Sequence, residues 1–167
     1  MSDKGQTKTE TAVRFERLLP GPIERVWDHL TRGEHIAAWF GGVGMKYTLE
    51  PRVGGTISFA NDHIRGVVTQ WRPPRFLAYT WNVFDTGETV SQHPESYVSF
   101  ELEPRCKDVL LILTHRPIPE AYQGQTMMGW HTFLELFEAL LRGEELQSRE
   151  TLMERNRKRY GVEAIKR

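Results

Sequence analysis

Two histidines and one arginine within apolar segments are the side chains of this sequence with the most usable chemistry. His115 ends a strand-like segment, and His131 follows Trp130 in a helix-like segment. A buried neutral imidazole can orient a ligand or act as an acid or base, because its reference pKa is about 6.5. A hydrogen bond to the backbone is the more ordinary role for each. Arg65 would bind a carboxylate or phenolate if it points inward, but the alternation of its strand leaves that direction open.

Aromatic side chains are plentiful, with five Trp, five Tyr and eight Phe. Such a stock suits an apolar ligand site with a few polar groups, although the same rings could simply fill a core. The residues that we predict to bind a ligand are Trp39, Phe40, Phe59, Arg65, Tyr79, Trp81, Phe100, His115, Met127, Trp130, His131 and Leu134.

Other catalytic chemistry is sparse. The sequence has no His-Glu-x-x-His motif and no cysteine cluster, which predicts no metal site. Its one cysteine, Cys106, has no neighbouring base to make it a nucleophile, and it fits a reducing, cytoplasmic setting. We therefore predict no catalytic residue and no cofactor, and we favour a binding protein over an enzyme.

Composition excludes several classes of partner. The 167 residues carry no formal net charge, so no electrostatic footprint favours nucleic acid. Apolar runs such as residues 109–113 are far shorter than the roughly 20 residues that span a bilayer, which predicts no membrane partner. A hydrophobic fraction of 39% suits one folded domain with a real core.

Hydrophobic periodicity and turn residues predict the elements that must position these side chains. A strand at 11–19 is followed by short helices at 22–30 and 32–40. The further strands are expected at 45–50, 56–59, 64–71, 76–81, 97–103 and 109–115, and a long helix at 122–141.

The long helix has the clearest pattern, because Met127, Trp130, Leu134, Phe137 and Leu141 recur at intervals of three and four. The connections between strands are too short for helical crossovers, so the sheet must be antiparallel. We predict an α+β fold in which a curved sheet of about seven strands wraps around that helix.

The chain divides into three parts by composition. Residues 1–10 are expected to form a disordered leader, residues 11–142 the folded domain, and residues 143–167 a charged tail. The tail is either a solvated helical extension or an arm that contacts a protein partner or a second copy.

Several landmarks occur in an order that resembles the SRPBCC superfamily, which includes START and birch-pollen-allergen-like proteins. They are Val26-Trp27, Trp39-Phe40, Arg52-Val53-Gly54-Gly55, Gly66-Val67, Pro73-Pro74-Arg75-Phe76, Thr80-Trp81, Leu113-Thr114-His115 and Gly129-Trp130. Within that superfamily, residues 11–142 resemble the bacterial branch related to the activator of heat-shock-protein-90 ATPase. The resemblance implies a helix-grip fold with a cavity between the sheet and the long helix.

Three functions stay open, because this fold serves many. The first is binding or sequestration of a hydrophobic, aromatic or polycyclic small molecule. The second is a polyketide cyclase or aromatase that uses His115, His131 or Arg65. The third is a co-chaperone-like interaction with a protein.

Overall fold

A seven-stranded antiparallel sheet and a long helix build the protein, seen here in a computed structural model that describes residues 4–41 and 44–163. The strand order is β1-β7-β6-β5-β4-β3-β2. The strands are β1 (Val13–Pro20), β2 (Thr48–Leu49), β3 (Thr56–Phe59), β4 (Ile64–Arg72), β5 (Phe76–Val83), β6 (Ser96–Arg105) and β7 (Asp108–Arg116). The helices are α1 (Ile23–Thr31), α2 (Gly33–Phe40), α3 (Gln123–Arg142) and α4 (Arg149–Arg159), with a 3-10 turn at Glu120–Tyr122.

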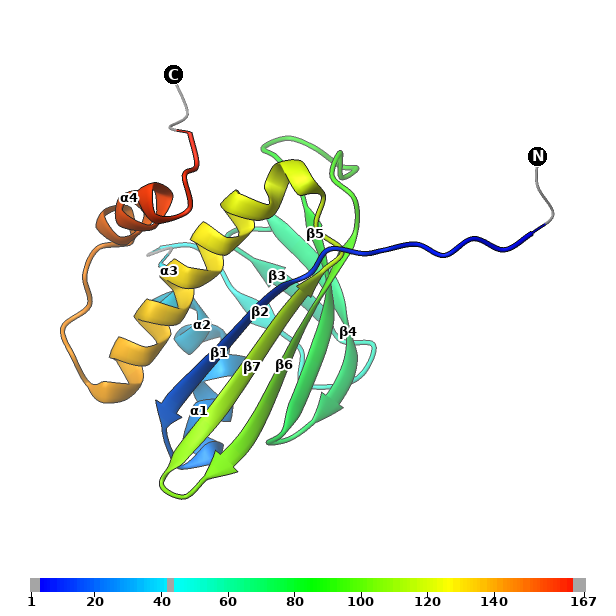
Figure 1. Cartoon of the computed structure of the whole chain (residues 1–167). Coiled ribbons are helices and arrows are strands. Elements are labelled where there is room, and N and C mark those ends of the chain that lie inside the picture. Colours follow the sequence, from blue (N-terminus) through cyan, green and yellow to red (C-terminus); the bar gives the residue numbers. More distant parts are fainter. Residues whose placement is uncertain (1–3, 42–43, 164–167) are drawn as a thin grey trace.

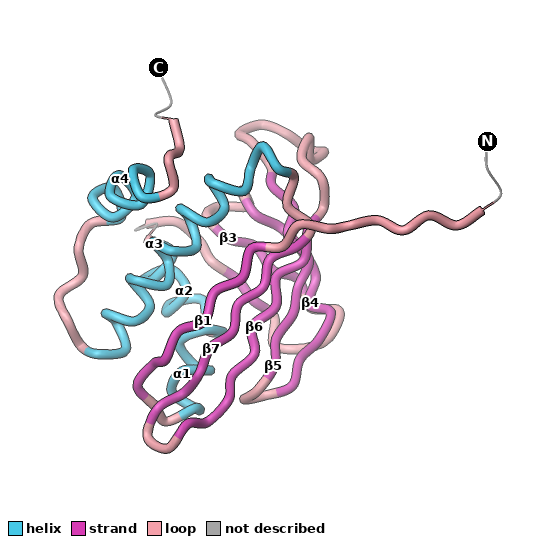
Figure 2. The backbone as a smooth tube through the Cα atoms, viewed as in Figure 1, coloured by secondary structure: helices cyan, strands magenta, loops and turns pink. Residues whose placement is uncertain are grey.

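The sheet is a meander from β2 to β7 that β1 completes at its far edge. β1 pairs with β7 in a register that sets Val13 opposite His115. Helix α3 crosses the inner face of the sheet, with α1 and α2 alongside it (Figures 1 and 2). The predicted α+β helix-grip architecture is thus confirmed.

Alternation along the strands decides which side chains face α3. On β5, Leu77, Tyr79 and Trp81 are buried, as predicted from their spacing. Alternate residues of β6 and β7 are buried in the same way, namely Val98, Phe100, Leu102, Leu111, Leu113 and His115. These residues meet the buried stripe of α3 and form one core.

The strand predicted at 45–50 is shorter in the structure, where β2 covers only Thr48–Leu49. The reason lies in the turn after β3, where Asn61 has a positive φ of 55°. Asn61 accepts a hydrogen bond from the backbone N–H of Lys46 and donates its own N–H to the Lys46 carbonyl. Because the backbone of Lys46 is bound to this turn, the strand begins only after it.

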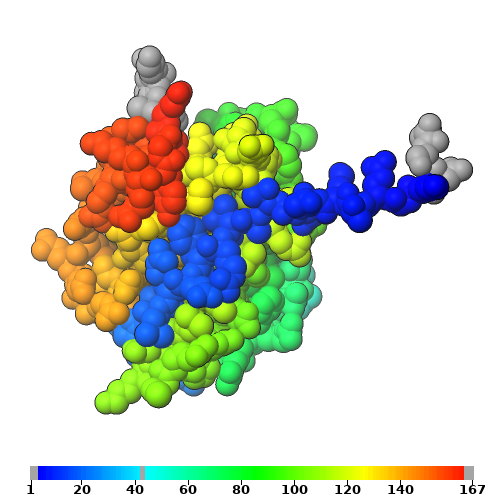
Figure 3. Space-filling view, in the orientation of Figure 1, coloured from blue at the N-terminus to red at the C-terminus, as the bar shows by residue number. Residues whose placement is uncertain are grey.

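The two ends of the chain differ. Residues 4–10 are exposed and have no regular structure, and residues 1–3 of the predicted leader lie outside the described part. In the predicted tail, residues 149–159 form α4, which lies against α3 (Figure 3). The last residues of the tail, 164–167, are also outside the described part.

Helix α4 is held by a cap at its start and by buried contacts with α3. The Ser148 hydroxyl caps it by accepting a hydrogen bond from the N–H of Thr151. Leu152 is buried, and the fully buried Asn156 donates hydrogen bonds to Thr132 and Glu135 of α3. This helix therefore packs on the domain instead of extending freely from it.

Within the described residues, no helix combines the length and the apolar character that a membrane span requires.

Gly66 should be the glycine of the sheet least tolerant of substitution. A Cβ at Gly66 would lie 1.8 Å from the backbone oxygen of Thr80 on the neighbouring strand. We expect Gly66→Ala to lower the free energy of unfolding by about 3 kcal/mol, because β4 and β5 would have to separate. Urea unfolding measures this loss.

Gly129 provides the matched control, because a Cβ there meets only the Phe133 ring, at 3.8 Å. Gly129→Ala should be neutral or stabilise α3 by up to about 1 kcal/mol. Equal stability of the Gly66 variant and the native chain would contradict the close strand approach.

Candidate functional site: two adjoining cavities at the start of α3

Two cavities lie where α3 begins above the sheet. The first has a volume of about 250 Å³ and is lined by Trp81, Val83, His93, Pro94, Ser96, His115, Pro117, Ile118, Pro119, Tyr122, Gln125 and Thr126. The second has a volume of about 210 Å³ and is lined by Phe40, His63, Ile64, Trp81, His115, Gln125, Thr126, Gly129, Trp130, Phe133 and Arg149. The two adjoin, because Trp81, His115, Gln125 and Thr126 line both.

Aromatic rings form the walls of the second cavity. The rings of Phe40 on α2 and Phe133 on α3 stack with centroids 4.2 Å apart. The rings of Trp81 on β5 and Trp130 on α3 also pack together, with centroids 5.4 Å apart. Because all four side chains are buried, these walls are held by the core and are formed without a ligand.

His115 stands between the cavities in a chain of buried hydrogen bonds. The Trp130 indole N–H donates to His115 Nδ1 over 2.9 Å. Since Nδ1 accepts, the proton of the neutral ring is on Nε2, which donates to the Ser96 hydroxyl over 2.7 Å. Ser96 lies 3.3 Å from the backbone oxygen of Trp81 and donates to it. Both ring nitrogens of His115 are therefore engaged.

Burial lowers the pKa of His115 to about 4, so the imidazole is neutral near pH 7. Protonation at Nδ1 would also remove the acceptor that Trp130 uses. His115 is thus held in one tautomer and one charge state, which suits a structural or orienting role better than proton transfer.

Of the twelve residues predicted to bind a ligand, four line a cavity: Phe40, Trp81, His115 and Trp130. Five others lie in the core without lining either cavity, namely Trp39, Phe59, Tyr79, Phe100 and Leu134. Burial raises the pKa of Tyr79, so its phenol is neutral. Met127 is partly buried against the core and also lies outside both cavities.

Arg65 and His131 lie away from the cavities. Ile64 and Val68 occupy the inner face of β4, so Arg65 points outward, where its guanidinium stacks 4.0 Å from the Phe84 ring. His131 faces α4, and its Nδ1 hydrogen-bonds to the Tyr160 hydroxyl at 2.7 Å. Burial lowers the pKa of His131, although Glu135 at 3.5 Å acts in the opposite direction.

Arg149 is a cavity residue that the sequence did not reveal. It is the first residue of α4, and its guanidinium carbon lies 6.0 Å from the Phe40 ring centre and 5.7 Å from that of Phe133. Its Nε is buried and has no hydrogen-bond partner within residues 4–41 and 44–163. A buried N–H without an acceptor costs about 1–3 kcal/mol, more when the group is charged.

Gly41 explains how Arg149 fits at this position. Gly41 ends α2 with a positive φ of 85°, and a Cβ there would come within 2.9 to 3.2 Å of the Arg149 side chain. The arginine stem thus packs on the bare backbone at the end of α2, which directs the guanidinium across the Phe40 and Phe133 rings. In the sequence Arg149 is one of many charged residues in a segment with few large apolar ones, so no pattern marks it as a cavity residue.

Comparison with known proteins places the chain among related folds. The family model described as "Activator of Hsp90 ATPase homolog 1-like protein" matches residues 20–142. No curated protein matches the sequence.

Solved structures similar to this chain come from several organisms. A crystal structure of a Mesorhizobium loti protein is 27% identical, covers 81% of this chain and 100% of its own, and has a TM-score of 0.67. A solution structure from Bordetella parapertussis is 26% identical, covers 99% and 92%, and has a TM-score of 0.70. An HSP90 activator from Plasmodium falciparum is 22% identical, covers 78% and 95%, and has a TM-score of 0.65.

The lowered pKa of His115 predicts a loss of stability in mild acid. The unfolded chain takes up a proton near pH 6.5, whereas the folded chain resists protonation until about pH 4. Stability is therefore complete above about pH 6.5 and falls as the pH drops. Between about pH 7.5 and pH 5 we expect His115 to cost about 2 kcal/mol.

Urea unfolding of the native chain and of His115→Gln at both pH values tests this effect. The variant should be less stable at the higher pH, but its stability should fall less as the pH drops. The interpretation is wrong if both chains lose the same free energy, since every other titrating group is shared.

Proposed function

The chain belongs to the Activator of Hsp90 ATPase homolog 1-like family, and we propose that it binds or sequesters a small aromatic molecule that carries an anionic group in the cavities beside α3. The observation that supports this most is Arg149, a cation whose buried Nε has no acceptor in the part of the protein that the structure describes and which borders a cavity with aromatic walls. A carboxylate or phenolate would supply the missing acceptor.

The energies favour a ligand with both features. Burial of about 200 Å² of apolar ligand surface contributes roughly 5 kcal/mol before the costs of association. That alone gives weak binding. A charge-assisted hydrogen bond adds about 1.5–3 kcal/mol, which is enough to raise the affinity about tenfold or more.

Size narrows the ligand further. Each cavity is smaller than the roughly 300–1,000 Å³ of typical small-molecule sites, so one cavity suits a ligand of one or two rings. A polycyclic ligand would need both cavities, joined past their shared lining residues. We therefore propose the smaller class of ligand.

The cyclase alternative receives less support from the positions of its candidate residues. It requires a side chain that exchanges protons inside a cavity. His115 has both nitrogens engaged, and Arg65 and His131 line neither cavity.

The protein-interaction alternative stays a prediction. Similarity to the Plasmodium activator lies at 22% identity and supports the fold alone. Part of the tail proposed as an arm is α4, whose buried face is occupied by α3.

Binding of 2-naphthoate and of its uncharged analogue 2-naphthamide tests the proposal. The two have the same rings, but only the naphthoate offers an anion to Arg149. We expect naphthoate to quench the fluorescence of Trp81 and Trp130 and to bind about tenfold more tightly than the amide. Arg149→Gln should bind the two compounds equally.

Arg65→Gln is the matched control, because Arg65 is a partly buried arginine that also stacks on a phenylalanine but lies outside both cavities. It should keep the preference for naphthoate. Absence of binding by either compound, or an unchanged preference in Arg149→Gln, would count against the proposal.

A further inference from the structure

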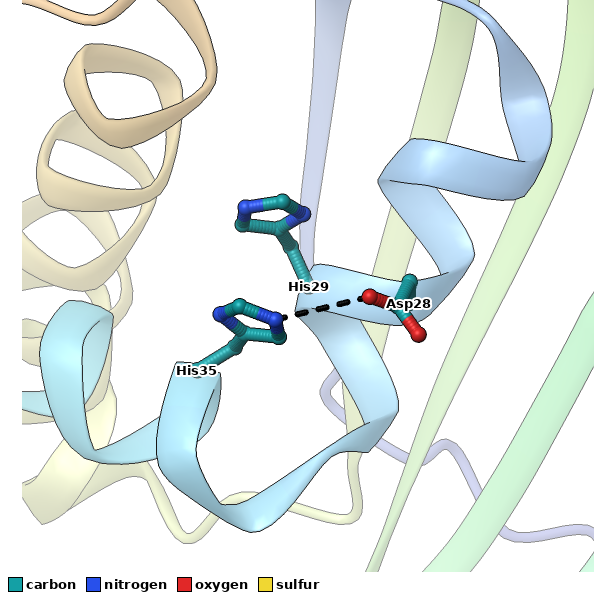
Figure 4. A group of neighbouring side chains, drawn as sticks. All are labelled: Asp28, His29 and His35. Carbon is teal, nitrogen blue, oxygen red and sulfur yellow. Dashed lines mark ion pairs between the residues drawn. The ribbon is translucent and has the colours of Figure 1, made fainter.

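Asp28, His29 and His35 form a cluster of metal-ligand side chains on α1 and α2, outside both cavities. Each offers one ligand atom, and the three atoms lie within 4.8 Å of one another (Figure 4). All three residues are partly buried, and they come from two helices that a single residue, Arg32, connects. The cluster thus lies where the end of α1 meets the beginning of α2.

The hydrogen bonding of His29 leaves a nitrogen free to bind a metal ion. His29 Nδ1 lies 2.9 Å from the backbone oxygen of Arg25. A carbonyl oxygen only accepts, so the neutral ring carries its proton on Nδ1, and Nε2 presents a lone pair. A histidine that donates its other N–H to a carbonyl is the usual arrangement of a metal ligand, because that bond fixes the tautomer and the ring orientation.

Asp28 is oriented in a comparable way. One carboxylate oxygen lies 2.6 Å from Arg32 Nε. The other lies 3.4 Å from His35 Nε2, the ion pair that Figure 4 marks. The guanidinium thus holds the carboxylate from one side and leaves the second oxygen beside the imidazole.

The distances suit a small tetrahedral ion after limited movement. Around zinc, with bonds of about 2.0–2.1 Å, neighbouring ligand atoms are about 3.3 Å apart. Asp28 and His35 already have this separation. The His29 and His35 rings stack with centroids 4.1 Å apart, and a rotation of the partly exposed His35 imidazole can bring its nitrogen closer to that of His29.

We propose that Asp28, His29 and His35 bind a divalent late first-row transition metal, of which zinc is the best fit, with water completing the coordination. Two imidazoles and one carboxylate suit zinc, whereas calcium and magnesium prefer oxygen ligands alone. This proposal departs from the prediction of no metal site, which was made because the sequence lacks a His-Glu-x-x-His motif and a cysteine cluster. Asp28 and His29 are adjacent in the sequence and His35 follows Asp28 by seven positions, a spacing that becomes a cluster because Arg32 alone separates α1 from α2.

Calorimetric titration of the whole chain with zinc chloride tests the site. One zinc should bind per chain and raise the midpoint of thermal unfolding, because an ion that binds the folded state alone stabilises it. Cobalt in place of zinc should give the visible absorption of a four-coordinate site. His35→Gln and Asp28→Asn should each weaken zinc binding by roughly tenfold or more.

His131→Gln is the matched control, because His131 also lies beside a carboxylate, Glu135 at 3.5 Å, but has no second imidazole. It should bind zinc like the native chain. Circular dichroism of each variant separates lost binding from lost folding. Absence of zinc binding by the native chain, or equal affinity in a folded His35→Gln, overturns the proposal. Neither outcome affects the naphthoate experiment, since no cluster residue lines a cavity.

Discussion

The hydrogen bond from Trp130 to His115 is the contact on which the site depends. It joins α3 to β7, and the bonds that follow it through Ser96 reach the backbone of Trp81 on β5. Helix α3 and the strands β5, β6 and β7 are thus tied together by a chain of buried hydrogen bonds. Trp130 begins this series of hydrogen bonds and Trp81 ends it, and both side chains also line the second cavity. The bonds that hold the helix on the sheet therefore also shape the cavity.

The fold was predictable because its signals agree with one another. Strand alternation, short turns and the apolar stripe of α3 all require a sheet that closes on one helix, and none depends on exact register. The early part of the sheet was less predictable. The alternation at 45–50 predicted a strand of six residues, but β2 is shorter. Its start is limited by hydrogen bonds between Lys46 and Asn61, a turn residue fifteen positions later in the sequence.

The cavity was predictable only in part, because alternation gives the face of a residue and not its depth. Phe59 and Trp81 both face inward, yet Phe59 is enclosed by other rings while Trp81 reaches the cavities. The direction of Arg65 could not be decided from its strand, where apolar residues and charged ones compete for the inner face. Arg149 was hidden for another reason: it belongs to a charged segment with one buried leucine, which gives almost no hydrophobic pattern.

Under the proposed function, the polar groups that line the cavities decide which ligand is preferred. The aromatic walls belong to the core, and flat apolar surfaces of this kind discriminate weakly between ligands of similar size. His115 lines both cavities, but both of its ring nitrogens are already hydrogen-bonded. It could form a hydrogen bond to a ligand only by breaking a bond that holds the fold. Arg149 is the arginine among the lining residues, and it lies beyond residues 20–142, the part that the family model matches. The positive charge beside the second cavity is thus supplied by α4, a helix outside the part that the family model matches.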